Sequence, residues 1–221
     1  MRSMKSQQSG FTLVEIAIVL VIIGLLLGGI LKGQELINSA KVKNIAQDFK
    51  NVPLYIYGYQ DRFKALPGDD PRVATNISGA TLATTPASSQ GNGVIDGTWN
   101  STTTTDESVL FWQHVRMANF ASGPTLVTDP DYYPKNVEGG RMGITNGQSA
   151  NTPITTMTGT YVFCSQGILG KFAKQLDTTL DDGNTFTGSL RTRATSATAQ
   201  DVAIATASVD DATSYTVCMA F

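Results

Sequence analysis

The side chains most often used in catalysis and metal binding are few and widely spaced in this chain. His114 is its only histidine, and Cys164 and Cys218 are its only cysteines. His114 is accompanied by no G-x-S-x-G segment, no H-E-x-x-H segment and no second histidine, so neither hydrolytic nor metal-dependent chemistry is indicated. We therefore expect no enzyme activity, no catalytic residue, no cofactor and no metal site, and we expect His114 to be an ordinary histidine on a helix surface.

Two other segments invite comparison with ligand-binding loops. Residues 91–97 (GNGVIDG) lack the glycine spacing of a dinucleotide loop. Asn92 and Asp96 could supply oxygen ligands to calcium, but an apolar residue lies between them and no glutamate closes an EF-hand-type loop, so a loop without metal is favoured. Asp181 and Asp182 follow an expected helix, where we expect them to shape a turn rather than to act as paired carboxylates in glycoside hydrolysis.

The most unusual ionisable residue is Glu15, because it lies inside a long apolar segment. Residues 11–31 are 21 residues with no other ionisable side chain. A helix of this length is roughly 31 Å long, which matches the hydrocarbon core of a bilayer. A secretory signal peptide has a shorter apolar run with small residues after it, whereas here Gly10 precedes the run. A carboxylate inside the span costs about 3 kcal/mol, so we predict a transmembrane helix in which Glu15 has a partner.

At these residues the chain resembles the type IV prepilin family, which includes the pseudopilins of type II secretion. The segment GFTLVE, residues 10–15, is similar to the family's processing motif of glycine, phenylalanine and, five residues into the mature chain, glutamate. The resemblance implies that a prepilin peptidase cuts after Gly10 and that the new amine of Phe11 is N-methylated. It also implies that Glu15 pairs with the positive N-terminus of a neighbouring subunit during assembly.

The resemblance further implies a function and a location. The chain would be a structural subunit of a type IV pilus or pilus-like filament, and a minor pilin or a type II secretion pseudopilin would share the same anchor. Its partners would be identical or homologous subunits, the prepilin peptidase/methyltransferase and the inner-membrane assembly machinery. It would lie in the bacterial inner membrane, single-pass with a periplasmic head, and then in a cell-surface or periplasmic filament. A membrane-tethered periplasmic binding or hydrolytic domain is the alternative of another class.

Length and charge agree with this interpretation. The chain has 221 residues, 41% of them hydrophobic, which suffices for one globular domain and a membrane anchor. Its 16 basic and 18 acidic residues give a net charge of −2. This balance provides no basic surface excess, so it gives no indication that nucleic acid is a partner.

The apolar pattern divides the chain into four expected parts. These are a leader at 1–10, shorter if Met4 is the start, a transmembrane and assembly helix at 11–31, its amphipathic outer half at 32–66, and a globular periplasmic or surface head at 67–221. Apolar residues at helical spacing predict the outer half, namely Leu36, Ile37, Ala40, Ile45, Ala46, Phe49 and Val52. Pro53 is expected to kink this helix.

The first part of the head combines a loop and a helix. Residues 67–105 are rich in Ser, Thr, Gly, Asn and Pro, and we expect a long surface loop or a poorly packed excursion. Residues 104–107 (TTDE) match a T-x-x-E capping box, which predicts a helix over 108–120.

The last third of the chain is expected to contain a sheet. Strands are predicted at 160–164, 186–192 and 214–220, and an amphipathic helix at 169–180. The expected fold class is therefore α+β, with a long N-terminal helix packed on an antiparallel β-sheet head, the pilin fold. Cys164 and Cys218 enclose 53 residues and would form a disulfide outside the cytoplasm, with two unpaired buried thiols as the alternative.

Overall fold

The computed structural model describes residues 12–148, 152–196 and 200–221. The elements in chain order are α1 (Leu13–Phe63), α2 (Val73–Asn76), α3 (Glu107–Met117), β1 (Met142–Asn146), β2 (Tyr161–Leu169), α4 (Gly170–Leu180), β3 (Leu190–Ala194), the 3-10 helix η1 (Thr206–Ser208) and β4 (Ser214–Ala220). The chain divides into two compact units, Met1–Ala40 and Lys41–Phe221. A long apolar N-terminal helix and an antiparallel sheet are both present, so the α+β prediction is confirmed.

The first unit contains the apolar part of α1. Its large apolar side chains from Leu13 to Leu31 are all exposed. This exposure reflects composition, because a helix that is apolar on every side has no polar face to turn toward water.

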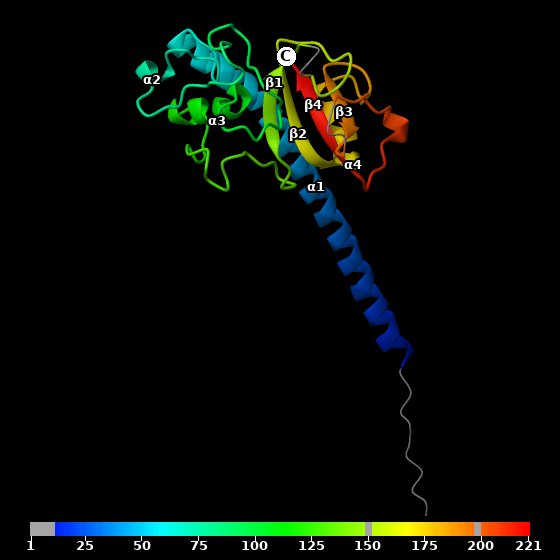
Figure 1. Ribbon diagram of the computed structural model, residues 1–221. Coiled ribbons are helices and arrows are strands. Elements are labelled where there is room, and N and C mark those ends of the chain that lie inside the picture. The colour runs from blue at the N-terminus through cyan, green and yellow to red at the C-terminus, as the bar shows by residue number, and fades with distance from the viewer. Residues whose placement is uncertain (1–11, 149–151, 197–199) are drawn as a thin grey trace, which may run out of the picture. The chain divides into compact units, whose positions relative to one another are not determined.

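The second unit is built on a four-stranded antiparallel sheet in the order β1-β2-β4-β3 (Figure 1). The long strand β2 and the C-terminal strand β4 form the centre of the sheet. Helix α3 lies beside β1, and α4 packs against β2, β3 and β4. The last strand runs over Ser214–Ala220 as expected, whereas β3 begins at Leu190, because residues 181–189 form a turn before it.

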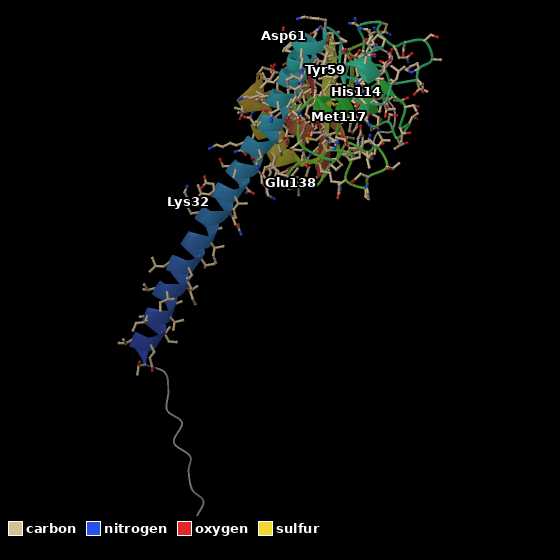
Figure 2. All side chains as sticks on the ribbon, turned by 90° about the vertical axis from the view of Figure 1, so that its left-hand side faces the viewer. Lys32, Tyr59, Asp61, His114, Met117 and Glu138 are labelled. Carbon is tan, nitrogen blue, oxygen red and sulfur yellow. A yellow bond between two sulfur atoms is a disulfide. The ribbon has the colours of Figure 1, made fainter. Side chains whose placement is uncertain are left out.

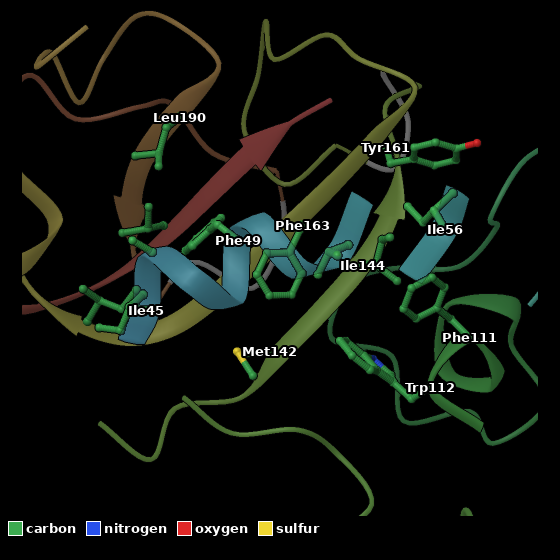
Figure 3. Close-up of a cluster of buried hydrophobic side chains, with 14 of the residues drawn as sticks. Ile45, Phe49, Ile56, Phe111, Trp112, Met142, Ile144, Tyr161, Phe163 and Leu190 are labelled. Carbon is green, nitrogen blue, oxygen red and sulfur yellow. The ribbon is translucent and has the colours of Figure 1, made fainter. Parts of the chain in front are cut away.

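The main core lies between the sheet and residues 41–63 of α1 (Figure 3). Buried helix residues follow a spacing of three and four, at Val42, Ile45, Ala46, Phe49, Val52, Ile56 and Tyr59. Phe49 meets Phe163 of β2 edge to face, with ring centroids 5.0 Å apart. The amphipathic pattern therefore faces the sheet from Val42 onward, whereas Leu36 and Ile37 remain exposed.

Pro53 lies inside α1, and the helix continues through it to Phe63. The helix ends shortly before the Leu66-Pro67-Gly68 segment, since proline cannot donate the next hydrogen bond and disfavours a helical residue before it.

The segment 67–105 is a long loop apart from α2, as expected, but the expectation of poor packing is wrong. Apolar side chains of this segment are buried, among them Leu66 at its start, Val73 of α2, Ile95 and Trp99. Two carboxylates, Asp69 and Asp70, are buried with them and accept backbone and side-chain hydrogen bonds. The segment is thus ordered by polar contacts, which a count of large apolar residues does not detect.

Cys164 and Cys218 form a disulfide between the two central strands. They are direct partners in the β2–β4 register, with Cα atoms 4.1 Å apart, and both are fully buried. The bridge joins strands that backbone hydrogen bonds already pair, so it reinforces the middle of the sheet.

Candidate functional site

The start of α1 is the candidate site for processing and assembly. Gly10 and Phe11, between which cleavage is expected, lie outside the described residues. From Thr12 onward the structure shows how the chain enters the helix. The Glu15 carboxylate accepts hydrogen bonds from the Thr12 backbone N–H and the Thr12 hydroxyl, each 2.8 Å long, and the Glu15 N–H donates to the Thr12 oxygen at 3.3 Å.

This reciprocal arrangement is a capping box at T-x-x-E, residues 12–15. It satisfies two helix N-terminal donors and places the carboxylate at the positive end of the helix dipole. This capping box is not among the features predicted from the sequence, where a capping box is expected only at 104–107. The same T-x-x-E signal was present at both places.

The helix that follows is long and apolar enough to cross a membrane, and within the described residues it is the one such helix. Its window of highest hydropathy has no buried residue. Four glycines, Gly24, Gly28, Gly29 and Gly33, lie on this helix, and apart from the neighbouring backbone of the helix itself a Cβ atom at any of them would meet no atom within 4 Å. Such glycines leave space for a second helix to approach closely in a membrane.

His114 of α3 is fully buried, so the prediction of a histidine on a helix surface is wrong. Its Nδ1 accepts a hydrogen bond from the Gly68 N–H at 2.9 Å, which leaves the proton on Nε2, 2.9 Å from the Thr81 carbonyl. Burial lowers the pKa of His114, so the ring is neutral in this arrangement. The ring lies nearly parallel to that of Tyr59 of α1, with ring centroids 6.2 Å apart; both residues are labelled in Figure 2. His114 therefore holds the 67–81 segment to two helices.

The capping box expected at 104–107 is also wrong, because Asp106 is the N-cap of α3 and makes no side-chain cap hydrogen bond. Glu107 is instead buried and contacts the preceding loop. Its Oε2 accepts the Asp96 N–H at 2.8 Å, and its Oε1 lies 2.7 Å from the Ser89 hydroxyl oxygen. Burial raises the pKa of Glu107 to about 7.

Residues 91–97 are organised around a carboxylate from elsewhere in the chain. Asp69 accepts hydrogen bonds from the backbone N–H groups of Gly91, Asn92 and Gly93. The Asn92 amide donates to Asp96 at 3.0 Å. Both glycines have positive φ, at 81° each, which glycine adopts without steric cost. The GNG sequence therefore wraps around the Asp69 carboxylate.

Asp181 and Asp182 shape the turn after α4, as expected from the sequence. Asp182 Oδ1 accepts the Asn184 N–H and Oδ2 accepts the Thr187 hydroxyl, both at 2.8 Å. Asp181 Oδ2 accepts the N–H of Leu190, the first residue of β3. A third carboxylate, Asp177, lies near them; it was not singled out in the sequence, because it looks like any polar residue of an amphipathic helix.

Comparison with known proteins identifies the N-terminal segment. Residues 5–31 match the family described as the prokaryotic N-terminal methylation motif, which is the hallmark of prepilins and pseudopilins. The predicted resemblance is thereby confirmed for the leader and the apolar helix. No curated protein and no solved structure gives a significant match to the chain. The motif and the apolar helix together indicate that the chain is anchored in a membrane.

Proposed function

We propose that this chain, a type IV pilin-like or pseudopilin subunit by its N-terminal methylation motif, is a structural subunit of a type IV pilus or pilus-like filament. A prepilin peptidase removes residues 1–10, and the mature chain polymerises through residues 11–31. The subunit binds copies of itself or homologous subunits and performs no catalysis.

One observation carries this proposal: the apolar stretch of helix from Leu13 to Leu31 has exposed large side chains throughout and contains a single carboxylate. Lipid covers the apolar side chains before assembly, but it provides neither a positive charge nor a hydrogen-bond donor for Glu15. The carboxylate then has only its hydrogen bonds from Thr12 of the same chain. A carboxylate within the span costs about 3 kcal/mol. A plain membrane anchor would gain from losing this residue.

The assembled filament supplies the missing partner. Cleavage before Phe11 exposes an α-amine, whose ordinary pKa is about 8, so the amine is mostly protonated at neutral pH. Opposite charges about 4 Å apart gain on the order of 4 kcal/mol at an effective dielectric constant of about 20. That gain offsets the cost of Glu15, and it is available when the Phe11 amine of one subunit meets Glu15 of the next.

The glycines of the helix serve the same assembly. Gly24 with Gly28 and Gly29 with Gly33 form two G-x-x-x-G pairs with open space above each residue. Because glycine has no side chain, a neighbouring helix can approach closely at these positions and gain van der Waals contact in lipid. The head unit, Lys41–Phe221, has its own core and sheet. Its fold therefore does not depend on contacts with neighbouring subunits.

The test compares Glu15→Gln with Glu35→Gln in the native host cell. Glu35 lies on the same helix, is exposed and pairs with Lys32 at 2.7 Å, so it is a matched control for charge loss. We expect Glu15→Gln to reduce the subunit in sheared filaments at least tenfold while its membrane level is unchanged, and Glu35→Gln to behave as wild type.

Normal filament incorporation of Glu15→Gln would overturn the proposal. In that case the tethered binding or hydrolytic domain becomes the better interpretation, since its head would work without assembly. Abundance in surface filaments favours a major pilin over a minor pilin or a pseudopilin.

A further inference from the structure

The turn after α4 brings three carboxylates together. One oxygen each from Asp177, Asp181 and Asp182 lies within 4.8 Å of the other two. Asp177 is buried, Asp181 is partly exposed and Asp182 is exposed, so the cluster reaches from the protein interior to solvent. We propose that these three residues bind a hard divalent cation, Ca²⁺ in preference to Mg²⁺.

The state of Asp177 is the observation that points to a ligand. Its side chain is fully buried, yet neither carboxylate oxygen makes a hydrogen bond of normal geometry among the described residues. Buried carboxylates in proteins are normally hydrogen-bonded, paired with a cation or coordinated to metal, because an unpartnered buried charge is costly. Asp177 therefore directs two oxygens into a cluster of two further acids.

The pKa values agree with this geometry. Burial raises the pKa of Asp177 to about 7, and the negative charges of Asp182 and Asp181 act in the same direction, opposed by the Gly183 N–H. Hydrogen bonds from Thr187 and Asn184 lower the pKa of Asp182. A cation would favour the ionised form of Asp177 over the protonated one.

No basic side chain among the described residues forms an ion pair with the cluster. The ion pairs of that part of the chain include Lys174 of α4 with Asp211, and none involves the three clustered acids. The guanidinium of Arg191, which lies just beyond the turn, donates to the Gly188 carbonyl and the Thr156 hydroxyl. The cluster also lies at the C-terminal end of a helix, where the dipole favours a positive charge.

The two outer carboxylates are held in place by the turn. Asp181 accepts the Leu190 N–H, and Asp182 accepts the Asn184 N–H and the Thr187 hydroxyl. Each of these oxygens uses one lone pair for its hydrogen bond and keeps another for a metal. The donors are thus all carboxylate oxygens, and the two outer carboxylates are held in place before any ion arrives.

This donor set selects the class of ion. Carboxylate oxygens suit Ca²⁺ and Mg²⁺ and not soft transition metals. Three carboxylates of unequal exposure on a turn do not form a regular octahedron, which Mg²⁺ demands and Ca²⁺ does not. Water completes the coordination on the exposed side of Asp182.

The experiment uses the full-length chain in detergent after chelator treatment and titrates CaCl₂ or MgCl₂ by calorimetry. We expect Ca²⁺ to bind at one site with a Kd on the order of 10⁻⁴ M, the range of extracellular calcium modules, and Mg²⁺ to bind at least tenfold more weakly. At about 50 times Kd, Ca²⁺ should raise the ratio of folded to unfolded protein about 50-fold.

Asp177→Asn and Asp182→Asn test the site, with Asp61→Asn as the control, since the Asp61 side chain is 91% exposed on α1. Asp182→Asn keeps an oxygen that can accept the Asn184 N–H, so this variant should still fold even if Asp177→Asn does not. Both site variants should weaken Ca²⁺ at least tenfold and lose the Ca²⁺-dependent stabilisation, whereas Asp61→Asn should retain both. Absence of Ca²⁺ binding, tighter Mg²⁺ than Ca²⁺ binding, or equal binding by Asp177→Asn and Asp61→Asn would overturn the proposal.

Discussion

Glu107 gives a sharp prediction about pH and stability. Ser89 Oγ lies 2.7 Å from both the Pro86 carbonyl and Glu107 Oε1, but its hydroxyl has one proton to donate. When Glu107 is protonated, its O–H can donate to Ser89 Oγ while Ser89 donates to the Pro86 carbonyl. The raised pKa of Glu107, about 7 against an ordinary 4.5, fits this neutral form.

The magnitude follows from that pKa difference. A carboxyl whose folded pKa is raised binds more protons in the folded state, so stability falls as pH rises from about 4.5 to about 7. That difference corresponds to about 3 kcal/mol at full ionisation, most of which separates pH 5 from pH 8. At pH 8, wild-type Glu107 carries this penalty.

Glu107→Gln should remove the penalty while keeping both hydrogen bonds. The amide nitrogen of the introduced glutamine can donate to Ser89 Oγ, and the amide oxygen can accept the Asp96 N–H. Relative to wild type, the variant should gain about 2–3 kcal/mol between pH 5 and pH 8, or roughly 5–10 °C in Tm for a domain of this size. Other raised carboxyls, such as Asp177, are common to both proteins and cancel in the difference.

The assay is thermal unfolding in detergent and EDTA, followed by tryptophan fluorescence, since Trp99 and Trp112 both lie in the head. Glu35→Gln, an exposed change outside the head, is the control and should track wild type at every pH. A gain that is the same at pH 5 and pH 8, or a Glu107→Gln protein that is less stable than wild type at pH 8, would refute the reasoning.

Two further predictions concern the sheet. Replacing both cysteines, Cys164→Ala with Cys218→Ala, should cost about 4 kcal/mol by loop entropy, seen as a Tm about 8–16 °C lower; an unchanged Tm would contradict it. Gly143→Ala should cost about 1–3 kcal/mol, because its Cβ would clash with the Trp99 carbonyl oxygen, whereas Gly28→Ala meets open space and should leave head melting unchanged. Equal melting of the two glycine variants would show that the 97–99 segment moves away freely.

The sequence predicts those parts of the protein that depend on local pattern. The motif at 10–15 and the apolar run after it identify the anchor, since both the residue types and the run length are local properties. The alternation at 214–220 predicts β4 to the residue, and the helical spacing of Ile45, Ala46, Phe49 and Val52 predicts the face of α1 that packs on the sheet.

What the sequence does not predict depends on contacts between distant residues. His114 has the local pattern of a surface residue, but it is buried because the 67–81 segment folds over it. The glycines and polar residues of 91–97 invite comparison with a ligand-binding loop. In the structure their backbone N–H groups bind the carboxylate of Asp69, which lies more than twenty positions earlier in the chain. Asp177 becomes part of an acidic cluster only because the turn brings Asp181 and Asp182 close to it. Each case requires tertiary structure that no local pattern contains.

The most direct test of the assembly mechanism is the mass of the mature N-terminal peptide, isolated from filaments or membranes of the native host. The proposal predicts a chain that begins at Phe11 and carries the added mass of one N-methyl group, because the charged amine that meets Glu15 exists only after cleavage. A chain that still begins at Met1 or Met4 would contradict the proposed mechanism.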